Sequence, residues 1–171
     1  MASDPSRIKL VVLDVDGCLT DGSINLDANG NETKRFNIKD GLIISAWKKL
    51  GFEVAIITGR TSGSVSARCS ELKIEHLYQG VKDKGEVLDS LLGTLGISLE
   101  ETAAVGDDWI DLPMLTRVGY AMCPSDAVKE VVEVSDYVCS RPGGHGAVRE
   151  AIEHLIDARG LRDKALSPYR G

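Results

Sequence analysis

The stretch IKLVVLDVDG, residues 8–17, decides the fold class of this chain. Its first part, Ile8–Leu13, is an apolar run of the kind found in strands that are buried on both faces of a parallel sheet. Asp14 and Asp16 follow, and alternation along an extended chain would place both carboxylates on one side, about 7 Å apart. Two such carboxylates repel each other unless a cation or a shared proton lies between them. Taken alone, the segment is also compatible with a solvated acidic turn.

Apolar runs and helical patterns alternate along the rest of the chain. Further strands are predicted at residues 53–58, 74–78, 102–105, 120–122 and 137–139, and helices at residues 42–50, 61–72, 82–95, 111–118, 127–132 and 147–159. This alternation predicts an α/β fold with three layers, in which helices cover both faces of a parallel, Rossmann-like sheet. Ligands of such sheets bind at the carboxyl ends of the strands. We expect a single domain over residues 1–171.

Two segments depart from this alternation. Residues 22–37 predict a β-hairpin, because Ile24 and Leu26 alternate with polar neighbours and an Asn-Gly pair lies in the turn that follows. The hairpin leaves the sheet directly after the first strand, so we expect it to form a flap there. Residues 160–171 lack periodicity and predict an extended tail.

The composition describes an acidic chain of 171 residues with a net charge of -6. It offers no general basic surface that would neutralise phosphates, which argues against nucleic-acid and anionic-membrane partners. The four cysteines lack CxxC spacing, and no apolar run approaches the roughly 20 residues of a membrane helix. Residues 1–7 carry no apolar signal-peptide core. We therefore expect a cytoplasmic protein with free cysteines.

Polar candidates follow two later elements of the predicted sheet. Thr58 ends the second strand, where its hydroxyl and the Gly59 amide are placed to bind a phosphate oxygen, although a helix cap explains them equally well. Lys84 begins the third helix. A lysine there is mildly unfavourable with the helix dipole and gains from an acidic partner, but a solvated lysine is the commoner case.

Three acids follow the fourth strand. Asp107 and Asp111 are four residues apart and share a face as the next helix begins, with Asp108 between them. Acids are favoured near a helix N-terminus, so capping alone would account for them.

Taken together, the acidic residues, Thr58 and Lys84 indicate a binding site, although each of them alone has a simpler explanation. Because the carboxyl ends of parallel strands meet at one edge of a sheet, we expect these acids, the hydroxyl and the ammonium to surround one pocket. Carboxylate oxygens together with water and phosphate suit Mg²⁺. The sequence therefore predicts a magnesium site that handles a small phosphorylated substrate.

These motifs together resemble the haloacid dehalogenase family of phosphatases and phosphotransferases. The resemblance covers roughly residues 8–159 and rests on LDVDG at 13–17, ITGR at 57–60, KDK at 82–84 and GDDWID at 106–111. It implies a magnesium-dependent phosphatase that works through an aspartyl-phosphate. By this resemblance, Asp14 is the nucleophile and Asp16 is the general acid and base. Asp14, Asp107 and the backbone carbonyl of Asp16 bind Mg²⁺, and Thr58 and Lys84 bind the phosphoryl group. Asp111, with Asp108 beside it, supports Lys84 or a metal-bound water.

A narrower resemblance is to the members that hydrolyse 3-deoxy-D-manno-octulosonate 8-phosphate in lipopolysaccharide core synthesis. It rests on DVDGCLTDG at 14–22, FNIKDG at 36–41, LYQGVKDK at 77–84 and GGHGAVRE at 143–150, and on the hairpin in place of a large cap domain. It implies a homotetramer whose neighbouring subunits complete each pocket. The implied sugar-binding residues are Asn37, Ile38, Lys39, Asp40, Gly41, Gly59, Arg60 and Arg68. A substrate carboxylate needs a cation besides Lys84, and arginine binds carboxylates through two hydrogen bonds.

Two alternatives remain open at this point. Phosphatases of nonulosonic acid 9-phosphates have a similar scaffold, but their sequences resemble Thr-Gly-Glu where this chain has Thr58-Gly59-Arg60. A receiver-like switch also forms an aspartyl-phosphate, yet it does not need an acid two residues after the phosphorylated aspartate, as Asp16 is here. His145 lies in a glycine-rich turn that suits either a close approach of a neighbouring subunit or of the tail, or a simple entry into the last helix, and it is given no catalytic role.

Overall fold

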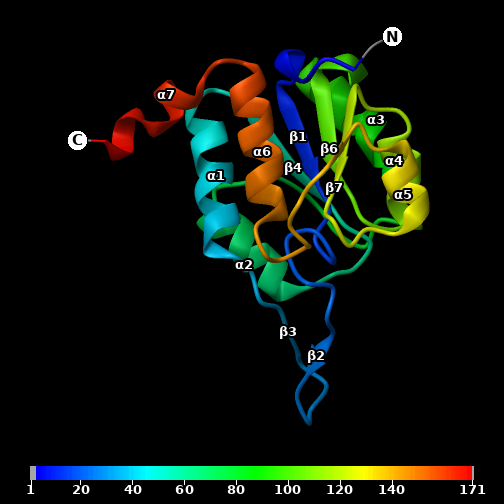
Figure 1. Ribbon diagram of the computed structural model, residues 1–171. Helices are drawn as coiled ribbons and strands as arrows, with labels where there is room; N and C mark the ends of the chain where they lie inside the picture. Colours follow the sequence, from blue (N-terminus) through cyan, green and yellow to red (C-terminus); the bar gives the residue numbers. More distant parts are fainter. Residues whose placement is uncertain (1–2, 171) are drawn as a thin grey trace.

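The computed structural model describes residues 3–170 and confirms the predicted parallel sheet (Figure 1). The strands are ordered β5-β4-β1-β6-β7-β8, and every neighbouring pair is parallel. Their bounds are β1 Leu10–Leu13, β4 Glu53–Ile57, β5 His76–Tyr78, β6 Thr102–Val105, β7 Tyr120–Cys123 and β8 Tyr137–Val138. The segment after β1 therefore leaves the middle of the sheet edge, between the ends of β4 and β6.

Side chains of the central strand alternate between two hydrophobic layers. Val11 and Leu13 belong to the core on one face, and Leu10 and Val12 to the core on the other. Helices α1, α2 and α6 cover the first face and α3, α4 and α5 the second (Figure 1). Their bounds are α1 Ile38–Lys49, α2 Gly63–Glu71, α3 Lys84–Leu95, α4 Leu112–Leu115, α5 Lys129–Val134 and α6 Ala147–Ala158. None of the helices within residues 3–170 has the length and apolar character that a bilayer crossing requires.

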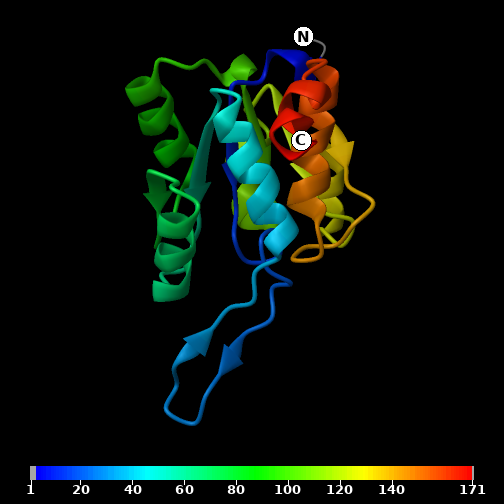
Figure 2. The same cartoon turned by 90° about the vertical axis from the view of Figure 1, so that its left-hand side faces the viewer.

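The predicted hairpin is present and extends away from the sheet edge (Figure 2). Its two strands, β2 (Asn25–Leu26) and β3 (Glu32–Thr33), are antiparallel and shorter than the sequence suggested. The turn is held by Asp27, whose carboxylate accepts hydrogen bonds from the backbone of Asn29 and Asn31 at 2.8 Å each. Residues 3–170 contain no cap domain larger than this hairpin.

The prediction of an extended tail at residues 160–171 is wrong, because its described part is helical. Helix α7 (Arg162–Leu166) is followed by a short 3-10 turn at Ser167–Tyr169. Leu161 and Ala165 pack against the core from the same side of this helix, and Arg162 forms ion pairs with α6. A helix of five residues is too short for a periodic pattern to be recognised, and contacts with α6 stabilise it.

A buried carboxylate connects α1 to α6. Asp40 lies in the first turn of α1, and its Oδ1 accepts a hydrogen bond of 2.8 Å from the backbone N–H of Arg149. Its Oδ2 is buried without a hydrogen-bond partner among the described residues. Burial raises the pKa of Asp40 to about 6, although the Arg149 hydrogen bond and the charges of Arg149, Arg68 and Arg141 act in the opposite direction. The ionised carboxylate is therefore a source of instability at neutral pH.

We expect the wild-type protein to lose stability relative to an Asp40→Asn variant as the pH rises from near 4 to near 7. The folded protein keeps the Asp40 proton up to about pH 6, whereas the unfolded chain releases it near 3.8, so a rising pH favours unfolding across this window. A shift of about two pKa units corresponds to about 3 kcal/mol in the free energy of unfolding. Urea unfolding of both proteins at several pH values measures the difference. Asp163→Asn, at an exposed position of α7, is the control, and a difference between wild type and Asp40→Asn that does not change with pH would contradict this assignment.

Candidate active site

A buried lysine lies at the centre of the polar residues at the carboxyl edge of the sheet. Lys84 is the first residue of α3, and its Nζ donates to Asp14 Oδ1 and to Asp111 Oδ1, both at 2.5 Å. The side chains of Lys84, Asp14 and Asp111 are 1%, 3% and 0% exposed. Burial lowers the pKa of Lys84, but the two carboxylates outweigh burial and the net pKa is raised. The ammonium therefore stays charged, and it holds the β1 and β6 loops together.

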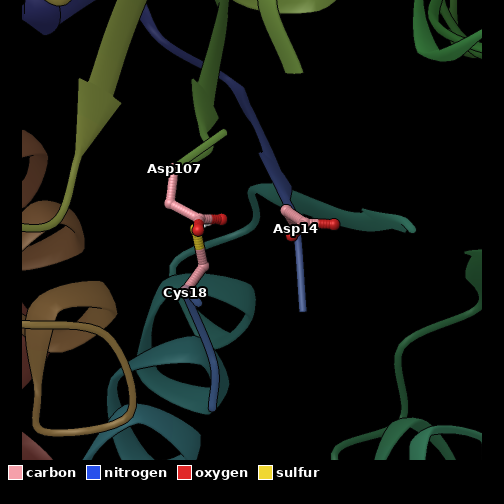
Figure 3. A group of neighbouring side chains, drawn as sticks. All are labelled: Asp14, Cys18 and Asp107. Atoms are coloured by element: carbon pink, nitrogen blue, oxygen red, sulfur yellow. Dashed lines mark hydrogen bonds between the residues drawn. The ribbon is translucent and has the colours of Figure 1, made fainter. Parts of the chain in front are cut away.

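Beside this ion pair, three potential ligand atoms converge. One atom each from Asp14, Cys18 and Asp107 lies within 4.8 Å of the others, and Figure 3 shows Cys18 and Asp107 pointing toward each other with Asp14 beside them. The Cys18 thiol donates to Asp107 Oδ1 at 3.6 Å. Burial raises the pKa of Asp107 to about 7, with further repulsion from Asp14 and Asp111, and burial also raises the pKa of Asp14. Two crowded carboxylates of this kind favour a bound cation.

The chemistry of these donors fits Mg²⁺. The carboxylate oxygens of Asp14 and Asp107 are hard ligands, which magnesium prefers, and they lie at the carboxyl edge of the sheet, where water and a substrate phosphate would supply the remaining ligands. Cys18 is a soft and poor ligand for this ion, and burial together with the charge of Asp107 raises its pKa well above the usual value of a thiol. It therefore acts as a neutral hydrogen-bond donor to Asp107.

Asp111 has two contacts with different parts of the site. Its Oδ1 pairs with Lys84, and its Oδ2 accepts hydrogen bonds from the backbone N–H groups of Asp107 at 2.9 Å and Asp108 at 3.2 Å. Of the two roles left open for Asp111, support of Lys84 is the one that its contacts favour. Asp108 is exposed and accepts from the N–H of Trp109 at 2.7 Å, so it caps the 3-10 turn at Trp109–Asp111.

Asp16 faces the hairpin and is not one of the three clustered ligand groups around Asp107. Its Oδ1 is hydrogen-bonded to Lys34 Nζ, and its Oδ2 lies 3.8 Å from Arg60 Nε. Arg60 also pairs with Glu32 of β3 at 2.6 Å. The two carboxylates of the DxD motif therefore pair with different cations. Asp14 pairs with Lys84, and Asp16 pairs with Lys34 and Arg60.

Thr58 reaches the same sheet edge because β4 ends beside β1. Thr58 is buried, its N–H donates to the carbonyl of Tyr78 at 2.9 Å, and its carbonyl accepts from Val81 at 3.1 Å, so the loop is fixed on both sides. Gly59 follows directly, and a Cβ atom there would lie 3.5 Å from Ile110 Cδ1. Thr58 and Gly59 thus lie at the edge where the other polar candidates gather.

The predicted sugar-binding segment begins at the cap of α1. Asn37 caps the helix by accepting from Lys39 N–H at 2.9 Å and also donates to the carbonyl of Gly144 at 3.3 Å. Arg68 donates to the carbonyl of Asn37 at 3.4 Å, and a Cβ atom at Gly41 would overlap with its guanidinium. Lys39 and its neighbour Ile38 are exposed. Asp40 is buried between α1 and α6, where it binds the backbone of Arg149 and so supports the segment without facing solvent. Arg60 and Arg68 contact different acids, so they do not form one paired site in this structure.

Lys34 and Cys18 were missed by the sequence-based prediction of the site, and the glycine-rich turn at Gly143–Gly144 was expected to approach a neighbouring subunit or the tail, or to form a simple helix entry. Glu32, Lys34 and Phe36 alternate along the hairpin, and this period of two was the available signal that Glu32 and Lys34 share a side. Cβ atoms at Gly143 and Gly144 would collide with the backbone of residues 17–21. The glycine-rich turn therefore allows a close approach within the same chain. The side-chain Nδ1 of His145 lies 2.8 Å from the carbonyl oxygen of Gly143.

Comparisons with known proteins agree with this geometry. A family model described as haloacid dehalogenase-like hydrolase matches residues 76–152. The 3-deoxy-D-manno-octulosonate 8-phosphate phosphatase of Escherichia coli strain K12 is 45% identical over 159 residues, which cover 93% of this chain and 85% of that protein. The crystal structure of the Moraxella catarrhalis phosphatase of the same name, in complex with a magnesium ion, a phosphate ion and KDO, has a TM-score of 0.95 at 40% identity and covers 98% of this chain and 96% of that chain. The cobalt-bound phosphatase from Haemophilus influenzae has a TM-score of 0.89 at 36% identity, with 92% of each chain covered.

We expect a Gly17→Ala substitution to weaken Mg²⁺ binding by about 10-fold or more, because the new Cβ atom would collide with the carboxylate of Asp107. Thermal stabilisation by increasing Mg²⁺ concentrations measures this affinity. Gly22→Ala is the matched control: both glycines have a positive φ, +91° and +74°, but the Cβ at Gly22 meets no atom closer than 3.6 Å. An equal loss of affinity in the two variants, or no loss in Gly17→Ala, would contradict the assignment of Asp107 as a metal ligand.

Proposed function

Because this chain belongs to the haloacid dehalogenase-like hydrolases and, among them, to the family of the 3-deoxy-D-manno-octulosonate 8-phosphate phosphatases, we propose that it is a magnesium-dependent phosphatase of lipopolysaccharide core synthesis. The proposed reaction converts 3-deoxy-D-manno-octulosonate 8-phosphate to 3-deoxy-D-manno-octulosonate and phosphate. The observation that carries the proposal is the buried Lys84, which binds Asp14 and Asp111 at 2.5 Å each, next to Asp107.

In this proposal, Asp14 is the nucleophile. Lys84 holds its Oδ1 and so fixes the orientation of the carboxylate, which attacks phosphorus and forms an aspartyl-phosphate as the bond to the sugar oxygen breaks. Asp14 and Asp107 would hold Mg²⁺, which neutralises charge on the phosphoryl oxygens. Thr58 and the Gly59 amide bind further phosphoryl oxygens, and Lys84 contributes its positive charge to the same group.

Asp16 is the proposed acid and base. It donates a proton to the sugar oxygen as that oxygen leaves, and it then takes a proton from the water that hydrolyses the aspartyl-phosphate. Its position supports this role, because it is two residues from Asp14 and its carboxylate faces the hairpin side of the site, away from the buried Lys84.

The eight-carbon sugar acid is the preferred substrate in this proposal, and the nine-carbon nonulosonic acid 9-phosphates are the second candidate. Arg60 favours the first, because its guanidinium lies beside Asp16 at the proposed leaving-group side of the site. Asn37, Lys39 and Arg68 would contact the sugar acid from the start of α1 and from α2.

Assembly and location follow the same resemblance. We place the enzyme in the cytoplasm as a homotetramer in which neighbouring subunits complete the pockets. Ile24 and Leu26 support the assembly, because these apolar side chains are exposed on the hairpin. All four cysteines are free thiols and buried, as is usual in a reducing compartment.

We expect Asp14→Asn to lower turnover by about 10³-fold or more while the fold is retained, because the amide is a poor nucleophile but has nearly the same shape. Release of inorganic phosphate in the presence and absence of Mg²⁺ measures turnover, and circular dichroism checks the fold. Asp163→Asn, remote from the site on α7, is the control. Substantial residual activity in a folded Asp14→Asn protein would reject Asp14 as the nucleophile.

Parallel assays with the eight-carbon and nine-carbon sugar acid phosphates test the substrate. We expect a higher kcat/KM for 3-deoxy-D-manno-octulosonate 8-phosphate, by about 10-fold or more, since one well-placed contact discriminates at this level. Preference for the nine-carbon compound would overturn the narrower assignment and leave the phosphatase chemistry intact.

A further inference from the structure

The hairpin places a buried lysine on the carboxylate of the proposed acid and base. Resting on the proposed function, we propose that Lys34 and Arg60 form an anion-exchange site: in the free enzyme they hold Asp16, and in the substrate complex they hold the carboxylate of the sugar acid, which releases Asp16 for proton transfer. Lys34 is then a specificity-determining residue, and the hairpin recognises the substrate through it.

The burial of Lys34 is the first observation behind this proposal. Its side chain is only 3% exposed, although it lies on a hairpin that extends away from the sheet edge (Figure 2). A buried ammonium requires anionic partners. Lys34 has two, Asp16 Oδ1 in direct hydrogen-bond contact and Glu32 Oε2 at 3.5 Å.

The arrangement of charges indicates which anion is exchanged. Two cations, Lys34 and Arg60, face two carboxylates, Glu32 and Asp16, so the group is balanced in the free enzyme. A substrate carboxylate that enters this group is a third anion, and one of the other two must give up its cations. Arg60 lies 2.6 Å from Glu32 but 3.8 Å from Asp16, whereas Lys34 contacts Asp16 directly and lies 3.5 Å from Glu32. Glu32 is two residues from Lys34 on the same hairpin arm, so the chain keeps it beside Lys34, while Asp16 belongs to the loop after β1. Asp16 is therefore the anion that is displaced.

Because Asp16 is the proposed acid and base, its contact with Lys34 and Arg60 affects the rate of proton transfer to the leaving oxygen. In the free enzyme both oxygens of Asp16 face cations, Oδ1 toward Lys34 and Oδ2 toward Arg60. An acid held in this way is not aimed at the leaving oxygen of a phosphate ester. A sugar phosphate that lacks a carboxylate leaves this contact in place, and its hydrolysis is slow for this reason.

There is room for a sugar acid beside Lys34. A groove with a volume of about 510 Å³ is lined by Lys34, Phe36, Ile38, Ser64 and Arg68, among other residues. The groove is shallow and open to solvent, and its lining adjoins Lys34 without including Asp16 or Arg60. A ligand in the groove has Lys34 at one side, and Phe36 and Ile38 provide apolar contact for its carbon chain.

The test compares a substrate that has a carboxylate with one that does not. We expect Lys34→Met to lower kcat/KM for 3-deoxy-D-manno-octulosonate 8-phosphate by about 10- to 100-fold, the usual effect of losing a charge-assisted hydrogen bond. For D-arabinose 5-phosphate, a primary sugar phosphate without a carboxylate, kcat/KM should rise in Lys34→Met, because Lys34 no longer holds Asp16. An unchanged value would reduce Lys34 to a carboxylate-binding residue and would overturn the exchange. Lys34→Arg should restore part of the preference. Arg35→Met, at a side chain that is 75% exposed on the same hairpin, is the matched control and should behave as wild type.

Binding gives a second readout that does not depend on turnover. Isothermal titration with 3-deoxy-D-manno-octulosonate, which has the carboxylate but no phosphate, should show a Kd about 10-fold higher or more in Lys34→Met than in wild type. Lys34→Gln serves in the same assays if Lys34→Met does not fold.

The outcomes separate this proposal from the proposed function. If wild type prefers the sugar acid phosphate over arabinose 5-phosphate and the Lys34 variants keep that preference, the exchange is overturned and the substrate assignment stands. Equal losses for both substrates in a folded variant also overturn it, because they indicate a purely structural role. If wild type shows no preference for the carboxylated substrate, the substrate assignment fails, and the exchange fails with it.

Discussion

The buried ammonium of Lys84 is the interaction on which the rest of the site depends. An unpaired charge in this position would be strongly destabilising, and two carboxylates at 2.5 Å compensate for it. One of them, Asp14, comes from the loop after β1, and the other, Asp111, follows β6. Because Asp111 also binds the backbone of Asp107, the same cation indirectly positions the carboxylate that faces Asp14. A single lysine at the start of α3 thus fixes three segments around one potential metal site.

The order of the strands brings the polar groups of the site together around the loop after β1. β1 is in the middle of the sheet, so the loop after it is flanked by polar groups from both β4 and β6. The loop is also in contact with the turn before α6, where Gly143 allows an approach to Gly17 that no side chain would permit. On the side away from this turn, Asp16 is contacted by Lys34 of the hairpin and by Arg60 of the loop after β4. The catalytic loop is therefore held by a buried cation on one side and by a hairpin cation on the other.

The sequence predicted the parallel sheet, its helices and the gathering of strand-end residues, because hydrophobic period and strand order determine these features. Asp14, Lys84, Asp107 and Asp111 come together as expected for this reason. The contact of Lys34 with Asp16 could not be predicted, since it depends on how the hairpin folds back over the loop and not on any spacing. The helical tail was missed for a similar reason: α7 is stabilised by contacts with α6, and its own sequence is too short to show a period.

The central claim is that Asp14 carries the phosphoryl group while Asp107 shares a metal ion with it and Lys84 stays paired with both acids. A crystal structure with Mg²⁺ and beryllium trifluoride, which mimics a phosphoryl group on a carboxylate, tests this most directly. The account predicts the fluoride adduct on an oxygen of Asp14, the ion between Asp14 and Asp107, and Lys84 still in contact with Asp111. An adduct on another residue, or a magnesium ion bound away from Asp107, would contradict it.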